Sequence, residues 1–230
     1  MEELFRSPLF QGVSAADAAS MLQCLGAQRR HYARGERILH MGETTESLGL
    51  VLAGRVRVES VDMWGGRTLL GDAGPGEVFA EAYACVPGET LMVDAVAAED
   101  AEILFLNAAR VLRLCPNACA FHGRMVQNLL TVLARKNLAL ARRSLHSAPR
   151  TIRGKLLSYL SFQALRQRSR SFAIPFDRQE LADYLGVDRS ALSSELGKMR
   201  REGLIDFHKN RFELKDTGDP LPDGGANARE

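Results

Sequence analysis

Two short amphipathic helices, a glycine turn and a β-ribbon are encoded between residues 176 and 214, and this segment constrains the fold most strongly. Asp177 and Glu180 have the spacing of a capping box, which predicts that the first helix begins there. Gly186 permits the left-handed backbone of a tight turn, and Asp188 is placed to cap the second helix. This order of features predicts a helix-turn-helix.

The second predicted helix covers 189–201 and ends at Gly203. Beyond it, the segments LIDFH and RFEL are joined by Lys209 and Asn210, which predicts a β-ribbon with an Asn-containing turn. A helix-turn-helix followed by such a ribbon is a winged helix-turn-helix, a module that binds DNA. The alternative is a small helical bundle whose charged faces are merely solvated.

The exposed N-terminal end of the second helix is the candidate base-reading surface. Side chains at this place in a helix-turn-helix reach base edges, and Arg can bind guanine O6 and N7 with two hydrogen bonds. The residues predicted to contact bases are Arg189, Ser190, Ser193 and Ser194. The residues predicted to contact phosphates are Arg178, Gln179, Lys198, Arg200, Lys209 and Arg211.

The charge of the chain is divided between its two halves, although the net charge is only +2. Residues 1–116 carry 10 Lys and Arg against 16 Asp and Glu, whereas residues 117–215 carry 19 against 8. An acidic front and a basic back are typical of a regulatory domain joined to a domain that binds a polyanion.

The front half has the pattern of an all-β domain. A short helix is predicted over 13–27, with Ser14 as its N-cap and Gly26 as its end. Short alternating runs bounded by glycines then recur through 29–102, which predicts a sandwich or barrel of short strands.

A helix of about 30 residues is predicted over 117–146. Apolar residues recur along it at heptad-like spacing, and Lys136 interrupts the pattern. The residues of this seam are Val126, Leu129, Leu133 and Leu140. The seam favours a dimerisation helix, and the alternative is a helix packed on its own β domain.

Two separate segments resemble the Crp/Fnr family of transcription regulators. The run DRQELADYLGVDRSALSSELGKMRREGLI is similar to the recognition module of that family. The glycines of Gly35-Glu36, Gly42-Glu43, Gly54-Arg55-Val56 and Gly74-Pro75-Gly76-Glu77 are similar to the framework of its cyclic-nucleotide-binding β-roll. The resemblance implies an α+β fold and a homodimer on a two-fold symmetric site in double-stranded DNA, with RNA polymerase as a candidate further partner.

The sequence patterns and the resemblance together divide the chain into four parts. We expect a cyclic-nucleotide-binding-like, jelly-roll-like β-roll sensor over 1–116, a long dimerisation helix over 117–146, a winged helix-turn-helix over 147–215 and a disordered tail over 216–230.

Departures from the family pattern concern the ligand and the DNA site. In members that respond to cyclic AMP, an Arg-Ser pair binds the cyclic phosphate and a Glu holds the ribose. Glu81 is kept, but Leu91 and Met92 occupy the Arg-Ser positions. A buried phosphate without a cation or hydroxyl partner is costly, so we expect that cyclic AMP is not the ligand.

The DNA site is also expected to differ. Family members that read a TGTGA-like half-site have Arg, Glu and Arg at the places of Arg189, Ser190 and Ser194, so the sequence preference of this chain should be different.

The signal itself is left open between a small molecule and a redox or metal signal, and some members of the fold bind nothing. Candidate effector-pocket residues are Glu81, Tyr83, Leu91, Met92, Asn128 and Thr131, with Trp64 and Phe79 as further lining. Candidate metal or redox groups are Cys85, Cys115, Cys119 and His122, although buried apolar cysteines account for the same pattern. The Cys cluster of oxygen-sensing members is absent, and we predict no metal site.

We therefore predict a cytoplasmic, homodimeric transcription regulator without enzymatic activity. No Ser/His/Asp, P-loop or paired-carboxylate arrangement is visible, and no stretch has the roughly 18 apolar residues of a membrane span. The alternative function is a cyclic-nucleotide- or metal-binding signalling module whose C-terminal domain acts through protein contacts.

Overall fold

The computed structural model describes residues 2–113 and 120–215, and the chain divides into two units, Met1–Lys136 and Asn137–Glu230. The tail predicted over 216–230 lies outside the described residues. Within the described ranges, no helix has the length and apolar character needed to cross a membrane.

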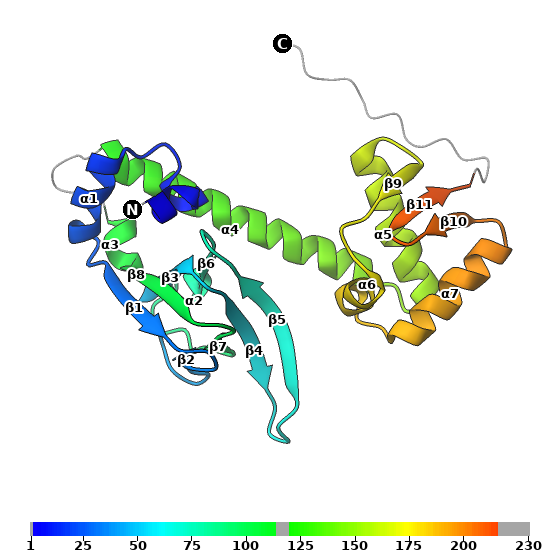
Figure 1. Ribbon diagram of the computed structural model, residues 1–230, viewed down its shortest axis with the longest axis horizontal. Coiled ribbons are helices and arrows are strands. Elements are labelled where there is room, and N and C mark those ends of the chain that lie inside the picture. The colour runs from blue at the N-terminus through cyan, green and yellow to red at the C-terminus, as the bar shows by residue number, and fades with distance from the viewer. Residues whose placement is uncertain (1, 114–119, 216–230) are drawn as a thin grey trace, which may run out of the picture. The chain divides into compact units, whose positions relative to one another are not determined.

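The strands described in the first unit form two four-stranded antiparallel sheets (Figure 1). One sheet has the order β1 (Gln28–Tyr32), β8 (Ala101–Asn107), β3 (Ser47–Ala53) and β6 (Val78–Phe79). The other has the order β2 (Arg37–Leu39), β7 (Asp94–Ala97), β4 (Val56–Val61) and β5 (Arg67–Ala73). The predicted α+β fold with an N-terminal β-roll is confirmed.

Strand β3 is buried on both of its faces, which explains why its sequence is an almost continuous apolar run. Leu50 and Leu52 belong to the core on one side of the sheet, while Val51 belongs to the core between the two sheets. Gly49 is needed within this strand because the ring of Phe79 lies where a Cβ would stand.

Short helices cover the outer face of the sheet that contains β3. They are η1 (Glu2–Arg6), η2 (Pro8–Phe10), α1 (Ala15–Cys24) and α3 (Ala108–Leu112), while α2 (Glu81–Ala84) follows β6. Helix α1 begins as predicted, because the Ser14 side chain accepts a hydrogen bond from the backbone N–H of Asp17. Leu9 and Phe10 are fully buried against this face, so the N-terminal segment is an integral part of the first unit.

Helix α4 (Ala120–Ser147) begins in the first unit and packs on the same apolar core. Leu129 is 1% exposed there, and Leu133 packs partly buried against the same cluster. These two members of the predicted dimer seam therefore contact the chain's own β domain. Val126 is half-buried, and Leu140 is 67% exposed.

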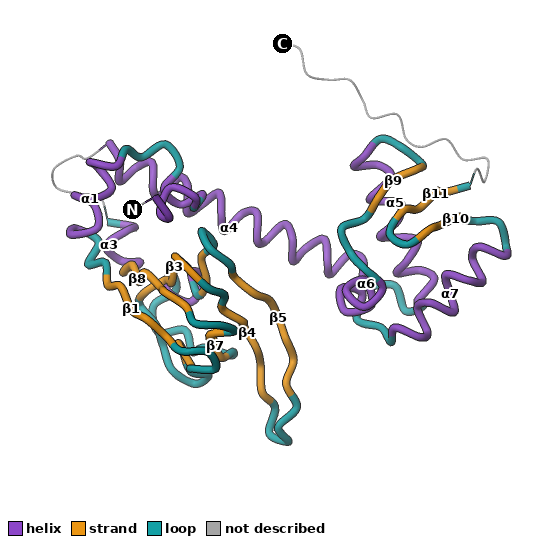
Figure 2. The backbone as a smooth tube through the Cα atoms, viewed as in Figure 1, coloured by secondary structure: helices purple, strands orange, loops and turns teal. Residues whose placement is uncertain are grey.

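The second unit joins a helical core to a three-stranded sheet (Figure 2). After the end of α4 its elements are α5 (Ile152–Gln167), β9 (Ser171–Ala173), α6 (Arg178–Leu185), α7 (Arg189–Arg201), β10 (Ile205–His208) and β11 (Arg211–Leu214). From its sequence, the run RSRSFAIPFD (168–177) is interpreted as a loop, but β9 pairs with β11 and Phe172 stacks on Phe212. Three residues are too few for alternation to reveal a strand.

His146, in the last turn of α4, lies in an aromatic cluster of the second unit. Its ring centroid is 5.6 Å from that of Tyr159, 5.1 Å from Phe162 and 6.1 Å from Tyr184. Nδ1 lies 3.1 Å from the Ser158 hydroxyl, whereas Nε2 is buried without a partner among the described residues. Burial lowers the pKa of His146 below its usual 6.5, because the charged ring would be desolvated.

We predict that His146 makes the second unit less stable as the pH falls below about 6.5. The unfolded chain then binds a proton that the folded chain resists, so unfolding becomes easier by at most about 1.4 kcal/mol per pH unit. Urea unfolding of wild type, His146→Asn and the exposed control His208→Asn at pH 5.5 and 7.5 measures this effect by circular dichroism. Only His146→Asn should lose pH dependence, and an unchanged dependence in that variant would contradict the assignment.

Candidate nucleic-acid interface and sensor site

The two helices of the predicted helix-turn-helix are capped as their sequence requires. The Asp177 side chain accepts from the backbone N–H of Glu180 at 2.9 Å, and Glu180 accepts from the backbone N–H of Asp177 at 2.8 Å. Gly186 has a φ of 61° at the turn, and Asp188 accepts from the backbone N–H of Ala191 at 2.8 Å. Local sequence signals therefore predicted this turn correctly.

Two cations from other helices bind the carbonyl groups at the C-terminal end of α6. Arg143 of α4 donates to the carbonyl oxygens of Asp183 and Tyr184, at 3.0 and 3.2 Å. Lys155 of α5 donates to the carbonyl oxygen of Leu185 at 3.0 Å. These bonds satisfy groups that a helix end leaves unpaired, and they tie α6 to both neighbouring helices. Sequence reasoning missed both residues, because the contacts span 30 or more positions.

Helix α7 separates a buried face from an exposed one. Leu192, Leu196 and Met199 are fully buried in the core of the second unit. All four residues predicted to contact bases, Arg189, Ser190, Ser193 and Ser194, are exposed on its N-terminal half. The Ser190 hydroxyl donates to Asp188 at 2.5 Å, and this bond contributes most to lowering the pKa of the Asp188 carboxyl.

A groove of about 550 Å³ lies beside this exposed end of α7. It combines the N-terminus of α6 with the first residue of α7 and the tip of the wing. Its basic lining is Arg178, Arg189 and Lys209, while Asp177 and Glu180 are engaged in the capping box. A concave surface with three cationic side chains and a helix N-terminus suits a polyanion.

Two of the predicted phosphate contacts also hold the wing. The Arg178 guanidinium carbon lies 4.8 Å from the centroid of the Phe207 ring and 5.2 Å from that of Phe212. Arg200 lies 5.5 Å from the Phe207 ring and forms an ion pair with Asp206 at 2.9 Å. These cation–π contacts fix the ribbon against the helices, so both arginines have a structural role besides any contact with DNA.

The remaining predicted phosphate contacts differ in their surroundings. Gln179 donates to Asp183 at 2.9 Å, and Lys198 lies 3.7 Å from Glu195. Lys209 and Arg211 are exposed on the wing, where Lys209 adopts a left-handed φ of 54° in the turn. Unlike Lys198 and Arg200, these two wing residues form no ion pair within the described part of the chain.

In the first unit, the buried carboxylate that sequence reasoning singled out is joined to α4. The side chain of Glu81 is 7% exposed and forms an ion pair with Lys136 at 2.7 Å. Lys136 also donates to the carbonyl oxygen of Val78 at 2.7 Å. The residue that interrupts the predicted seam thus binds the β-roll, a contact that helical periodicity could not reveal.

The other predicted effector residues have separate surroundings. Leu91 is 2% exposed and Met92 is 70% exposed, while Tyr83 is half-buried. Asn128 donates to the carbonyl oxygens of Leu9 and Gln11, and Thr131 bonds to its own helix. Trp64 is 91% exposed at the turn between β4 and β5, so its predicted place in the cavity is wrong.

The candidate redox and metal groups receive little support from the part of the chain that is described. Burial, followed by the nearby Glu81 carboxylate, raises the pKa of the Cys85 thiol and so disfavours the reactive thiolate. His122 is buried, and no group of three His, Cys, Asp or Glu residues among the described ones is arranged to hold a metal ion. Cys115 and Cys119 lie outside the described residues.

Comparison with known proteins places both units. Residues 29–117 match the cyclic nucleotide-binding domain, and residues 154–218 match the Crp-like helix-turn-helix domain. The cyclic AMP receptor protein of Thermus thermophilus is 29% identical over 222 residues, which cover 92% of this chain and 94% of that protein. The nitrogen fixation regulation protein FixK of Bradyrhizobium diazoefficiens is 27% identical over 206 residues, 84% of this chain and 80% of that protein.

Solved structures share the same fold. The c-di-GMP-responsive global regulator CLP of Xanthomonas campestris has a TM-score of 0.54 at 20% identity, covering 87% of this chain and 100% of that one. CprK in complex with OCPA has a TM-score of 0.61 at 17% identity, covering 86% of this chain and 90% of that one.

Proposed function

Because this chain belongs to the Crp/Fnr family of DNA-binding transcription regulators, we propose that it is a homodimer that reads a two-fold symmetric site under the control of a signal at the β-roll. The observation that carries this proposal is the basic groove of the second unit, where Arg178, Arg189 and Lys209 meet the N-terminus of α6. In a family of this kind, the exposed end of α7 enters the major groove.

Arg189 is the residue to which we assign base reading. It is exposed at the first position of α7, and it makes no ion pair within the described residues. A guanidinium so placed can bind guanine with two hydrogen bonds, whereas Ser193 and Ser194 discriminate less. Lys209 is assigned to a phosphate, because it stands exposed at the tip of the wing.

We predict that Arg189→Ala weakens binding to a site selected from random DNA by roughly 1–3 kcal/mol for each half-site, while binding to random sequence changes much less. Lys209→Gln should weaken both, and should reduce the slope of log affinity against log salt by about 2, because the homodimer loses one phosphate contact in each subunit. Fluorescence anisotropy at several salt concentrations measures both quantities. Equal losses on the two DNAs for Arg189→Ala would exclude the base-reading role.

The dimer interface that we propose lies on an exposed stripe of α4, next to the seam expected from the sequence. Leu129 and Leu133 are occupied by the core of the first unit, which leaves other apolar residues of the helix without cover. Leu130, Leu138 and Leu145 are 66%, 53% and 62% exposed, and alanines stand between them. The stripe is Leu130, Ala134, Leu138, Ala141 and Leu145, at spacings of three or four that keep it on one face.

We predict that Leu138→Glu converts the dimer into a monomer at micromolar concentration, because a carboxylate in a helix–helix seam would be desolvated. Sedimentation equilibrium measures the association constant. Leu165→Glu, on the 45% exposed Leu165 of α5, is the matched control and should leave the dimer intact. A Leu138→Glu protein that sediments as wild type would rule out this stripe as the interface.

We propose that the signal is not cyclic AMP, although a relative carries that ligand in its name. Leu91 is buried and Met92 is exposed at the positions where the resemblance expects Arg and Ser, so neither supplies a partner for a cyclic phosphate. Glu81, expected to hold a ribose, is already paired with Lys136. The raised pKa of Cys85 also disfavours a thiolate switch at that residue, and we propose a small molecule as the signal.

We predict that cyclic AMP leaves the thermal midpoint unchanged, even at millimolar concentration. A ligand present at 100 times its Kd would stabilise the fold by about 2.7 kcal/mol, which a thermal-shift experiment readily detects. Native mass spectrometry of the purified protein, with an absorbance spectrum, then identifies any bound molecule. A saturable rise in the midpoint with cyclic AMP would overturn this part of the proposal.

A further inference from the structure

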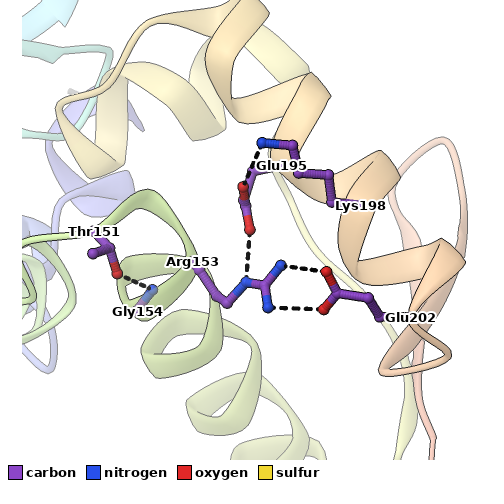
Figure 3. Close-up of polar contacts among 6 residues, drawn as sticks. All are labelled: Thr151, Arg153, Gly154, Glu195, Lys198 and Glu202. Atoms are coloured by element: carbon purple, nitrogen blue, oxygen red, sulfur yellow. Dashed lines mark hydrogen bonds and ion pairs between the residues drawn. The ribbon is translucent and has the colours of Figure 1, made fainter.

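A single arginine outside the DNA-facing surface binds two carboxylates, one in α7 and one on the residue that follows it (Figure 3). Arg153, in the first turn of α5, donates from both terminal nitrogens to the two oxygens of Glu202, each at 2.8 Å. Its Nε donates to Glu195 at 2.7 Å. All three guanidinium nitrogens are therefore used, and the fork on Glu202 has the bidentate geometry that fixes direction as well as distance.

The backbone that carries Arg153 is itself closely defined. Thr151 caps α5 by accepting from the backbone N–H of Gly154 at 3.0 Å, as Figure 3 shows. A Cβ at Gly154 would lie 2.9 Å from the Cβ of Pro149, so the chain approaches α5 too tightly for a side chain there. The backbone that carries the Arg153 side chain is thus fixed at the N-terminus of α5.

The two carboxylates lie seven positions apart, near the middle and just beyond the end of α7. Helical periodicity puts Glu195 and Glu202 on one flank, and puts Ser193 and Ser194 on another. The buried leucines hold α7 against the core, but apolar burial is non-directional and tolerates small rotations of a helix. Directed hydrogen bonds at two heights of the helix resist such rotation.

The contact stabilises the charged forms of both partners. Donation to Glu202 and Glu195 raises the pKa of Arg153, and the hydrogen bond from Arg153 contributes most to lowering the pKa of Glu202. The side chains of Arg153 and Glu202 are 37% and 46% exposed, and ion pairs at such exposure contribute little to stability. Any large effect of Arg153 should therefore concern the orientation of α7.

We propose that Arg153 is a positioning residue for DNA recognition, which holds α7 through Glu195 and Glu202 in the rotation that presents Arg189 to a base. This inference rests on the proposed DNA-binding function. It assigns no DNA contact to Arg153 itself. If the proposal is right, sequence specificity depends on this cluster, whereas affinity for DNA in general does not.

The test compares wild type with Arg153→Lys, which keeps the charge but loses the fork. The ratio of affinity for the selected site to affinity for random DNA should fall at least about fivefold, whereas affinity for random DNA should stay the same. Arg166→Lys, on an exposed arginine of the same helix, is the matched control and should leave the ratio unchanged. Thermal midpoints measured in parallel confirm that each protein is folded at the assay temperature.

A double-mutant cycle adds a readout that loss of stability alone would not give. Glu202→Gln should lower the ratio as Arg153→Lys does, and the double variant should lose little more, because both changes break one unit. Glu202→Gln also supplies the test on its own if Arg153→Lys does not fold. An unchanged ratio in Arg153→Lys, or equal losses on both DNAs, would overturn the positioning role. Absence of any site preference in wild type would instead overturn the proposed function.

Discussion

Two-sided burial of the central strands is the constraint on which the first unit depends. Strand β3 has apolar side chains on both faces, so a single sheet-to-sheet core cannot cover it. The N-terminal helices, α3 and the start of α4 supply the second layer. Helix α4 is therefore a structural part of the β-roll, and the Glu81–Lys136 ion pair adds a polar link between the two. A change at this pair would act on the helix directly, without an intermediary.

The second unit is organised differently, because directed bonds supplement its apolar core. Arg143 from α4 and Lys155 from α5 bind the end of α6, and Arg153 binds α7. The Arg178 and Arg200 guanidinium groups, which lie against phenyl rings of the wing, complete the set. Five cations thus hold the helix-turn-helix and its wing, so part of the positive charge visible in the sequence serves the fold. The basic character of this half overstates the number of cations that are free for DNA.

Local sequence signals predicted the helices and their caps well, but they did not predict contacts between residues far apart in the sequence. The caps at Ser14, Asp177 and Asp188 were correct, since each is decided within three residues of backbone. The leucine pattern of α4 predicted a helix but could not say which face meets the chain's own core. Helical periodicity is the same whether a face packs on its own β domain or on a second subunit. Only tertiary packing therefore makes Leu129 buried and Leu130 exposed. Lys136 and Arg153 were missed because their partners lie tens of positions away.

The separation of flanks on α7 has a consequence for how such a regulator diverges. The exposed serines lie on a flank of α7 that does not contact Arg153. Glu195 and Glu202, which bind Arg153, lie on the other flank. If these serines meet bases as we propose, substitutions at Ser193 or Ser194 alter the preferred operator without loosening the helix. Duplicated copies of the gene would be free to acquire new target sites while they inherit one unchanged scaffold.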